Sequence, residues 1–326
     1  VIKYWIKQGA RGWRLDVADE LPGVFIKELR HALKGVNPDA VLIGEVWEDA
    51  TNKVSYGSLR EYLLGEELDA AMNYPFKDMV YNFLLEHGNG EHFHRASMTL
   101  YENYPKEAFF GAMNLLGTHD VIRLRTILGE APAEDSLTRD QQSTYKMTEE
   151  QKSLATKRQK LATLLQMTFP GVPAIYYGDE AGMEGYRDPF NRGTYPWGNE
   201  DLSMVDWYKK LIMLRNKMDA LRSGDYIPIV YQGGVYGFIR QIEKNTDVFG
   251  EYAENGLVLI LINRDREQTH NIGIDLTSYS IKNLKNALDE SNDFKFDNGY
   301  LTINLKPLTG VMLVSDDCNK KGASTT

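Results

Sequence analysis

The chain has 326 residues, enough for about two domains, and its 42% hydrophobic and 25% charged residues are ordinary for a globular protein. Its formal net charge of −9 argues against a nucleic-acid partner, which normally needs a basic surface. No apolar stretch approaches the roughly 18 residues that cross a bilayer, and the single cysteine, Cys318, excludes an intrachain disulfide.

The first two thirds of the chain alternate strand-like and helix-like segments. Apolar runs and period-two alternation predict strands over residues 11–18, 41–47, 68–74, 108–118 and 173–178. Helical periodicity predicts helices over residues 1–8, from Pro22 to about Gly35, after Pro75, over 151–168 and through 204–214. Residues 129–150 are polar and predict a surface insertion, and residues 182–200 predict a long glycine-rich loop. This order is typical of β/α repeats with a parallel sheet.

After about residue 221 strand-like runs follow one another without helices between them. Turn signals such as Asp297-Asn298-Gly299 separate these runs. The pattern predicts a small antiparallel β-sandwich. We therefore expect a barrel part over residues 1–220, a β-sandwich domain over 221–317 and a flexible tail over 318–326.

Three acidic residues follow strand-like segments: Asp16 in RGWRLDVAD, Glu45 in VLIGEVWED and Asp120 in MNLLGTHDV. The carboxyl ends of parallel strands meet at one rim of a β/α barrel, where catalytic residues lie. Asp16 and Asp120 each also fit the role of a helix N-cap. Three acids in this pattern favour a site at the rim.

The neighbours of these acids point to the cleavage of glycosidic bonds, which needs one proton donor and one carboxylate at the anomeric carbon. Arg14 lies two residues before Asp16 and points to the same side, and a guanidinium there favours an ionised carboxylate. Trp47 shares a face with Glu45, and apolar surroundings suit a general acid. His119 next to Asp120 is able to bind a sugar hydroxyl.

These segments carry a family resemblance. The stretches GWRLDVADE, GEVWED and LLGTHD resemble the second, third and fourth conserved regions of the α-amylase family of glycoside hydrolases. IYYGDEAGMEG and DPFNRGTYPW resemble its eighth barrel strand and the loop that follows. MNYPF resembles the branch of cyclomaltodextrinases, neopullulanases and maltogenic amylases. The resemblance covers nearly the whole chain.

The resemblance implies roles for individual residues. It makes Asp16 the nucleophile, Glu45 the acid/base and Asp120 the group that stabilises the transition state of a retaining hydrolase. The remaining positions are implied to bind an α-glucan oligosaccharide: Arg14, Trp47, Asn73, Tyr74, Phe76, His119, Arg123, Asp188 and Arg192. Tyr74 and Phe76 also fit a plain core, and Asp188 with Arg192 a loop ion pair. Asp19 stands where this branch usually has asparagine.

The chemistry requires no organic cofactor, and we assign no metal ligand. Many relatives bind calcium, so the resemblance leaves that ion open, although no loop has EF-hand spacing. We expect no membrane partner and no nucleic-acid partner. The compartment stays open.

The fold class that we predict is α/β, an incomplete (β/α)8 TIM barrel containing strands four to eight, followed by an all-β C-terminal sandwich. About five β/α strands are found, and a closed barrel needs eight. The expected partners are therefore an N-terminal part of the same enzyme or a second copy in a homo-oligomer. Two alternatives remain beside a hydrolase of α-1,4 or α-1,6 bonds: a non-catalytic glucan-binding or structural fragment, and a 4-α-glucanotransferase with the same residues.

Overall fold

The computed structural model describes residues 1–279, 281–289 and 293–315 of the chain. These residues form two compact units. The first unit contains Val1–Met79, Arg95–Leu116 and Gly171–Ala174, and the second contains Val80–His94, Gly117–Pro170 and the described residues from Ile175 on. The predicted tail and Cys318 lie outside the described residues. The predicted boundary near residue 221 stays a prediction.

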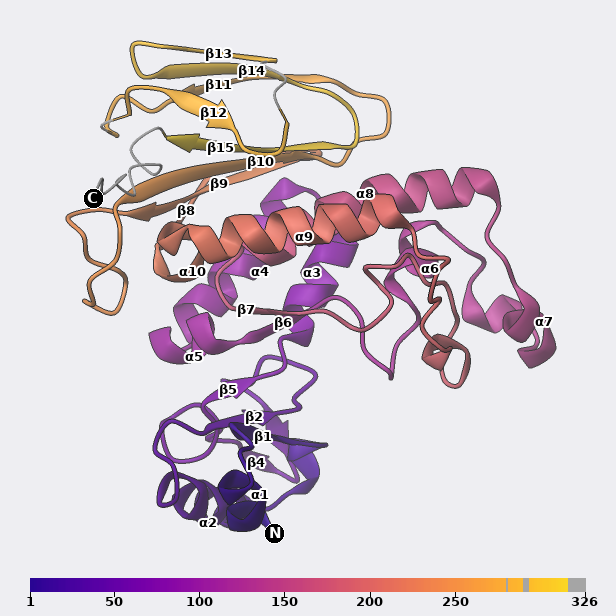
Figure 1. The fold of residues 1–326 in the computed structure, drawn as a ribbon, viewed down its shortest axis with the longest axis vertical. Helices are drawn as coiled ribbons and strands as arrows, with labels where there is room; N and C mark the ends of the chain where they lie inside the picture. The colour runs from indigo at the N-terminus through magenta and orange to yellow at the C-terminus, as the bar shows by residue number, and fades with distance from the viewer. Residues whose placement is uncertain (280, 290–292, 316–326) are drawn as a thin grey trace. The chain divides into compact units, whose positions relative to one another are not determined.

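Short parallel strands form the centre of the first unit. Strand β1 (Gly12–Leu15) pairs with β2 (Val41–Gly44), which pairs with β5 (Ala70–Ala71). A parallel bridge between Met72 and Met113 leads to β6 (Met113–Leu115), which pairs with β7 (Val172–Ala174). The five parallel strands described in this unit are therefore neighbours in chain order. Figure 1 shows β1, β2 and β5 side by side.

Amphipathic helices flank these strands. Helix α2 (Gly23–Lys34) begins directly after Pro22 and buries Ile26, Leu29 and Leu33, which recur on one helix face. The other helices and strands that lie wholly or partly in this unit are α1 (Ile2–Lys7), η1 (Ala18–Glu20), β3 (Val54–Ser55), β4 (Ser58–Leu59), α3 (Tyr74–Leu84), α4 (Gly90–Asn103) and α5 (Lys106–Gly111).

The predicted strand over residues 108–118 is wrong in its first half. Residues Lys106–Gly111 form helix α5 after Pro105, and the strand begins only at Met113. Phe109 and Phe110 are buried from that helix. A short apolar run fits a buried helix as well as a strand, so the pattern alone did not separate the two. The other predicted strands of this part exist but are two to four residues long.

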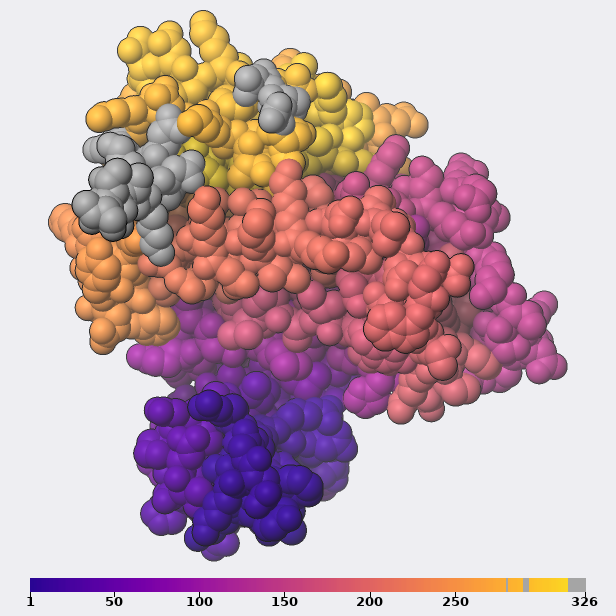
Figure 2. All heavy atoms as spheres, viewed as in Figure 1, coloured from indigo at the N-terminus to yellow at the C-terminus, as the bar shows by residue number. Residues whose placement is uncertain are grey.

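The second unit combines helices with a β-sandwich. Its helices are α6 (Leu124–Leu128), η2 (Glu134–Ser136), α7 (Arg139–Thr144), α8 (Glu149–Thr168), η3 (Phe190–Arg192), α9 (Leu202–Lys217) and α10 (Asp219–Ser223). Most of the polar segment 129–150, which includes η2 and α7, is exposed. Figure 2 shows this segment in pink at the surface.

The sandwich has two antiparallel layers, as the alternating strand patterns predict. One sheet has the order β12-β15-β10-β9-β8 and the other the order β11-β14-β13. Figure 1 shows the two layers, with α8, α9 and α10 beside the larger sheet. Side chains such as Ile239, Leu259 and Leu313 form the core. The strands are β8 (Asp225–Gln232), β9 (Val235–Ile242), β10 (Gly256–Asn263), β11 (His270–Asp275), β12 (Leu284–Asn286), β13 (Phe294–Asp297), β14 (Tyr300–Leu305) and β15 (Thr309–Ser315).

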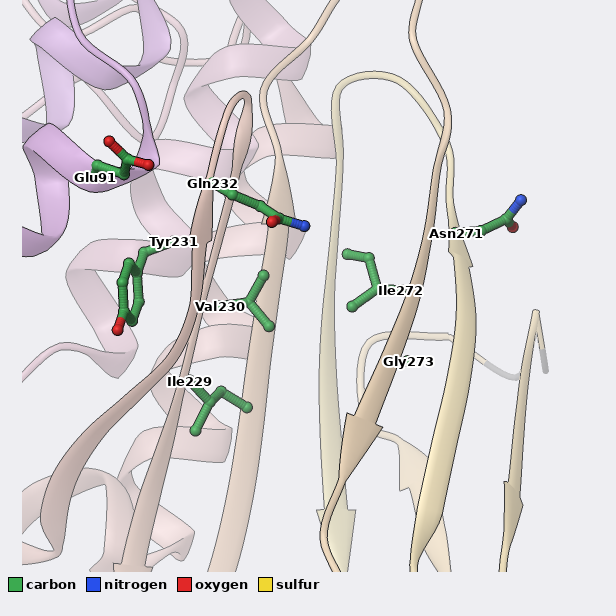
Figure 3. A pocket seen from close by; sticks show the side chains of 8 residues that line it. All are labelled: Glu91, Ile229, Val230, Tyr231, Gln232, Asn271, Ile272 and Gly273. Atoms are coloured by element: carbon green, nitrogen blue, oxygen red, sulfur yellow. The ribbon is translucent and has the colours of Figure 1, made fainter.

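A cleft of about 400 Å³ opens at the side of the sandwich, between the edge strands β8 and β11. Figure 3 shows Val230 of β8 and Ile272 of β11 on opposite sides of it. None of the predicted site residues lines this cleft. Over the described part of the chain, no helix combines the length and apolar character needed to cross a membrane.

Candidate active site

Two of the predicted acids follow neighbouring parallel strands in the first unit. Asp16 comes directly after β1 and Glu45 directly after β2, and the strands are in register from Gly12 opposite Val41 to Leu15 opposite Gly44. The carboxyl ends of both strands therefore lie at the same edge. Asp16 is 71% exposed, whereas Glu45 is only 4% exposed.

Arg14 binds both carboxylates with one guanidinium. Its Nη1 lies 2.5 Å from Oδ1 of Asp16 and its Nη2 lies 3.0 Å from Oε1 of Glu45. Its Nε lies 3.4 Å from the sulfur of Met72. The planar fork of arginine is suited to two acceptors at once. Besides the apolar neighbours that the sequence places near Glu45, Arg14 therefore reaches this acid across the strands.

The backbone after Asp16 also holds Glu45. The Val17 N–H donates to Oε2 of Glu45 at 2.9 Å, and the Ala18 N–H donates to the Glu45 carbonyl at 3.1 Å. Val17 has a left-handed backbone conformation with φ of +44°, which is costly for a β-branched residue. Asp16 is not an N-cap, because η1 begins at Ala18 and its N-cap is Val17.

The other predicted binding residues of the first unit are Trp47, Asn73, Tyr74 and Phe76, and Tyr74 lies beside Glu45. Trp47 is 42% exposed and stacks on Tyr74, with ring centroids 4.3 Å apart and an interplanar angle of 11°. Tyr74 is buried, and its hydroxyl lies 3.4 Å from Oε1 of Glu45. Phe76 is fully buried, as the alternative of a plain core predicts. Asn73 is buried, accepts from the Phe76 N–H at 3.0 Å and donates to Asn114 at 2.8 Å.

The third acid lies in a turn of the second unit. Asp120 comes five residues after the end of β6, and its N–H donates to the Thr118 hydroxyl at 3.1 Å. It is not an N-cap, because Arg123 holds that position for α6. Nε2 of His119 lies 3.2 Å from its Oδ2, and Nη2 of Arg192 lies 3.8 Å from its Oδ1. All three side chains are accessible to solvent.

The loop from 182 to 200 brings two further predicted residues to this turn. Arg192 pairs with Asp188 at 2.8 Å, and both are about half exposed. The loop ion pair therefore exists, and its guanidinium also lies near Asp120. An exposed pair of this kind contributes about 0–1 kcal/mol to stability. Because both side chains are about half exposed, they remain accessible to a ligand.

Arg123 is buried in the second unit, unlike His119, Asp188 and Arg192. Its side chain is fully buried, its Nη1 lies 3.2 Å from Oδ1 of the buried Asp179, and it donates to the Tyr177 carbonyl. Its guanidinium lies 4.2 Å from the ring centroid of Tyr176. Burial raises the pKa of the Asp179 carboxyl to about 7, and the charge of Arg123 opposes part of that rise. Arg123 thus contacts protein groups from several sides.

The sequence patterns did not single out Asp179, Asn191, Lys53 or Tyr62. Asn191 is fully buried and donates to two backbone carbonyls of the Asp120 turn. Lys53 and the Tyr62 hydroxyl hold Asp19, at 3.0 and 2.7 Å. Asp179 and Asn191 stand inside the quoted stretches IYYGDE and DPFNR, which is a sequence signal, but their partners depend on loop folding.

Within the described ranges, no three histidine, cysteine, aspartate or glutamate side chains gather as metal ligands would. The predicted catalytic acids lie instead beside arginines: Asp16 and Glu45 beside Arg14 in the first unit, and Asp120 near Arg192 in the second. Such groups are able to donate protons, to act as nucleophiles and to stabilise positive charge.

The fold and these acids describe a mixed α/β protein with a C-terminal β domain, and comparisons with known proteins identify its family. The model of the alpha amylase catalytic domain matches residues 1–200. The chain belongs to the alpha-amylase family.

Curated relatives agree with this assignment. An amylopullulanase from Thermoanaerobacterium saccharolyticum is 35% identical over 97% of this chain and 25% of its own length. Neopullulanase 2 from Thermoactinomyces vulgaris is 30% identical over 96% of this chain and 46% of its own length. The chain therefore spans a quarter to about half of these relatives.

Solved structures of related enzymes are also similar to this chain. A cyclomaltodextrinase matches with a TM-score of 0.75 and 26% identity, over 97% of this chain and 47% of its own. The debranching enzyme from Nostoc punctiforme matches with a TM-score of 0.74 and 28% identity, over 96% of this chain and 59% of its own.

Proposed function

We propose that this chain carries the acids of a retaining glycoside hydrolase that cleaves α-1,4 or α-1,6 glucosidic bonds. Its substrates are starch-derived oligosaccharides, cyclodextrins or pullulan. One observation carries the proposal: Asp16 and Glu45 follow neighbouring parallel strands and share the guanidinium of Arg14. A retaining mechanism needs two carboxyl groups about 5–5.5 Å apart, and a shared guanidinium keeps two such groups close together.

Solvent accessibility distinguishes the nucleophile, Asp16, from the acid/base, Glu45. Asp16 is largely exposed, so one of its oxygens is free to attack the anomeric carbon. Glu45 is buried and fixed by Arg14 and the Val17 N–H, which suits a group that must hold its position through two proton transfers.

The reaction then follows in two balanced steps. Glu45 gives its proton to the glycosidic oxygen as that bond breaks, and Asp16 forms a covalent bond to the sugar. Glu45 next takes a proton from a water molecule, whose oxygen displaces Asp16. Asp120 stabilises the positive charge that develops at the sugar, and no organic cofactor is needed.

Substrate binding uses the aromatic and charged groups beside the acids. The exposed ring of Trp47, supported by Tyr74, offers a flat surface for a sugar ring. His119 is accessible to donate to a hydroxyl, and the half-exposed pair of Asp188 and Arg192 offers an acceptor and a donor to a sugar. These groups support a carbohydrate ligand.

We also place the five described parallel strands in a (β/α)8 barrel, as its strands four to eight. Their parallel order and the helices between them support this placement. Eight strands close a barrel, so three further strands come from another part of the full-length protein or from a second copy of it.

Substitution of the nucleophile tests the function. In the full-length gene product, Asp16→Asn removes the attacking oxygen, and we expect kcat on maltooligosaccharides and cyclodextrin to fall by at least about 10³-fold. The matched control is Asp39→Asn, an exposed aspartate in the same unit, which leaves kcat unchanged. Near-normal hydrolysis by the Asp16→Asn variant would overturn the assignment.

A further inference from the structure

Asn191 connects the loop 182–200 to the turn that carries Asp120. Its side chain is fully buried in η3 (Phe190–Arg192). Its Nδ2 donates to the His119 carbonyl at 2.8 Å and to the Val121 carbonyl at 2.7 Å. These two carbonyls belong to the residues on either side of Asp120, so a single amide group fixes the backbone before and after the acid.

The rest of the turn is held as well. The Asp120 N–H donates to Thr118, and the Arg123 N–H donates to the Gly185 carbonyl of the same loop at 3.0 Å. Arg192, the next residue after Asn191, lies 3.8 Å from the Asp120 carboxylate. The loop therefore contacts Asp120 through its backbone, by way of Asn191, and through its side chain, by way of Arg192.

The side-chain amide of Asn191 uses its donors but not its acceptor. Both hydrogens of its amide nitrogen serve the turn, whereas its Oδ1 is buried and lacks a hydrogen-bond partner in the described part of the chain. A buried acceptor left unsatisfied costs about 1–3 kcal/mol. A residue chosen for stability alone would avoid that cost, but a neutral side chain with two donors suits the two carbonyls beside Asp120.

We propose that Asn191 is a positioning residue that fixes the place of the Asp120 carboxylate for catalysis. This inference rests on the proposed hydrolase function. Catalysis is sensitive to position, since a displacement of about 1 Å can cost about 10²-fold in rate. Loss of the two hydrogen bonds therefore affects the transition state, which Asp120 stabilises, more than the binding of the ground-state substrate.

The test uses the full-length gene product with three single substitutions: Asn191→Ala, Asn191→Ser and Asp120→Asn. Two double variants combine Asp120→Asn with Asn191→Ala or with Asn191→Ser. We expect Asn191→Ala to lower kcat on maltooligosaccharides by roughly 10- to 100-fold, with KM changed less than about threefold. Asn191→Ser keeps one donor and gives an intermediate kcat. In the Asp120→Asn background both substitutions have little further effect, because the group that they position is already gone.

The matched control is Asn199→Ala, an exposed asparagine in the same loop, which keeps the wild-type kcat. Thermal unfolding shows whether each variant folds. If the alanine variant does not fold, the kcat of the serine variant tests the inference. Additive losses in the Asp120→Asn background, or a wild-type kcat in both Asn191 variants, would overturn the inference. Normal activity of Asp120→Asn alone would instead refute the role of Asp120 in the proposed function.

Discussion

Two arginines in this chain bind acids in opposite environments. Arg14 is one third exposed and holds the exposed Asp16 together with the buried Glu45. Arg123 is fully buried and faces the buried Asp179. The exposed Asp16 carboxylate is able to contact a ligand. The buried pair of Arg123 and Asp179 instead holds the segment after Asp120 in place. Similar ion pairs thus serve different purposes according to their burial.

The buried pair predicts a pH dependence of stability. Burial raises the pKa of Asp179 to about 7, from about 3.9 in an unfolded chain. The folded state then binds a proton more tightly than the unfolded state between these values, so the contribution of Asp179 to stability falls as pH rises from about 4 to 7. We expect the free energy of unfolding of the wild type to fall relative to that of Asp179→Asn over this window.

Urea unfolding at a series of pH values measures this difference. The asparagine variant also changes the hydrogen bond between position 179 and Arg123, which adds an offset between the two proteins that does not vary with pH. Only the change of the difference with pH reports the titration. Parallel pH profiles of the two proteins would contradict the raised pKa.

At this scale the sequence predicted that Asp16 and Glu45 follow strands, because alternation and strand ends are visible in a sequence, and their neighbouring positions follow from parallel pairing. Asp120 instead lies in a turn five residues after β6, and the contacts that hold the three acids were not predicted. Asn191 could not be found in the same way, because its two acceptors lie 72 and 70 residues away. Contacts of that range depend on how loops fold.

At the scale of elements, periodicity predicted the helices better than the short strands. Helix α8 was expected over 151–168 and runs over Glu149–Thr168, with a capping box at Thr148. The parallel strands are only two to four residues long, so a pattern of alternation extends past their ends. The antiparallel strands were easier to predict, since they are mostly six to eight residues long and have turns between them.

Arg240 of β9 joins helix ends to the sandwich. Its buried guanidinium donates to the Thr168 carbonyl at 2.7 Å, to the Leu221 carbonyl at 3.1 Å and to the Gly224 carbonyl at 3.0 Å. These carbonyls lie at the C-terminal ends of α8 and α10. Such ends carry a partial negative charge and unsatisfied acceptors.

Substitution of this arginine tests the junction. We expect Arg240→Met to lower the free energy of unfolding by roughly 3 kcal/mol, because buried acceptors lose a charged donor. The measurement is urea unfolding followed by tryptophan fluorescence. The control, Arg222→Met, removes a half-exposed arginine of α10 and should cost under about 1 kcal/mol. Equal losses for both variants would argue against the junction.

At the scale of the whole molecule, the order of the parallel strands matters most. Among the described strands, β1 pairs only with β2 and β7 pairs only with β6. Each therefore has an unpaired edge, which is a template for pairing with another chain. The parallel order was predicted from the β/α repeat, but the lengths of the strands were not.

The open edges predict how the 326-residue chain behaves by itself. We expect it to self-associate as its concentration rises, and to have a kcat/KM on maltooligosaccharides at least about 10²-fold below that of the full-length gene product. Light scattering after size-exclusion chromatography and a hydrolysis assay measure the two effects. A purified monomer with full turnover would contradict this prediction.

The left-handed conformation of Val17 has a consequence for engineering this protein. A valine there costs of the order of 1–3 kcal/mol, yet its N–H holds Glu45 directly beside Asp16. Glycine would remove the strain and let the backbone move. Directed evolution for heat resistance would therefore favour glycine at this position, whereas selection for sugar turnover would retain valine.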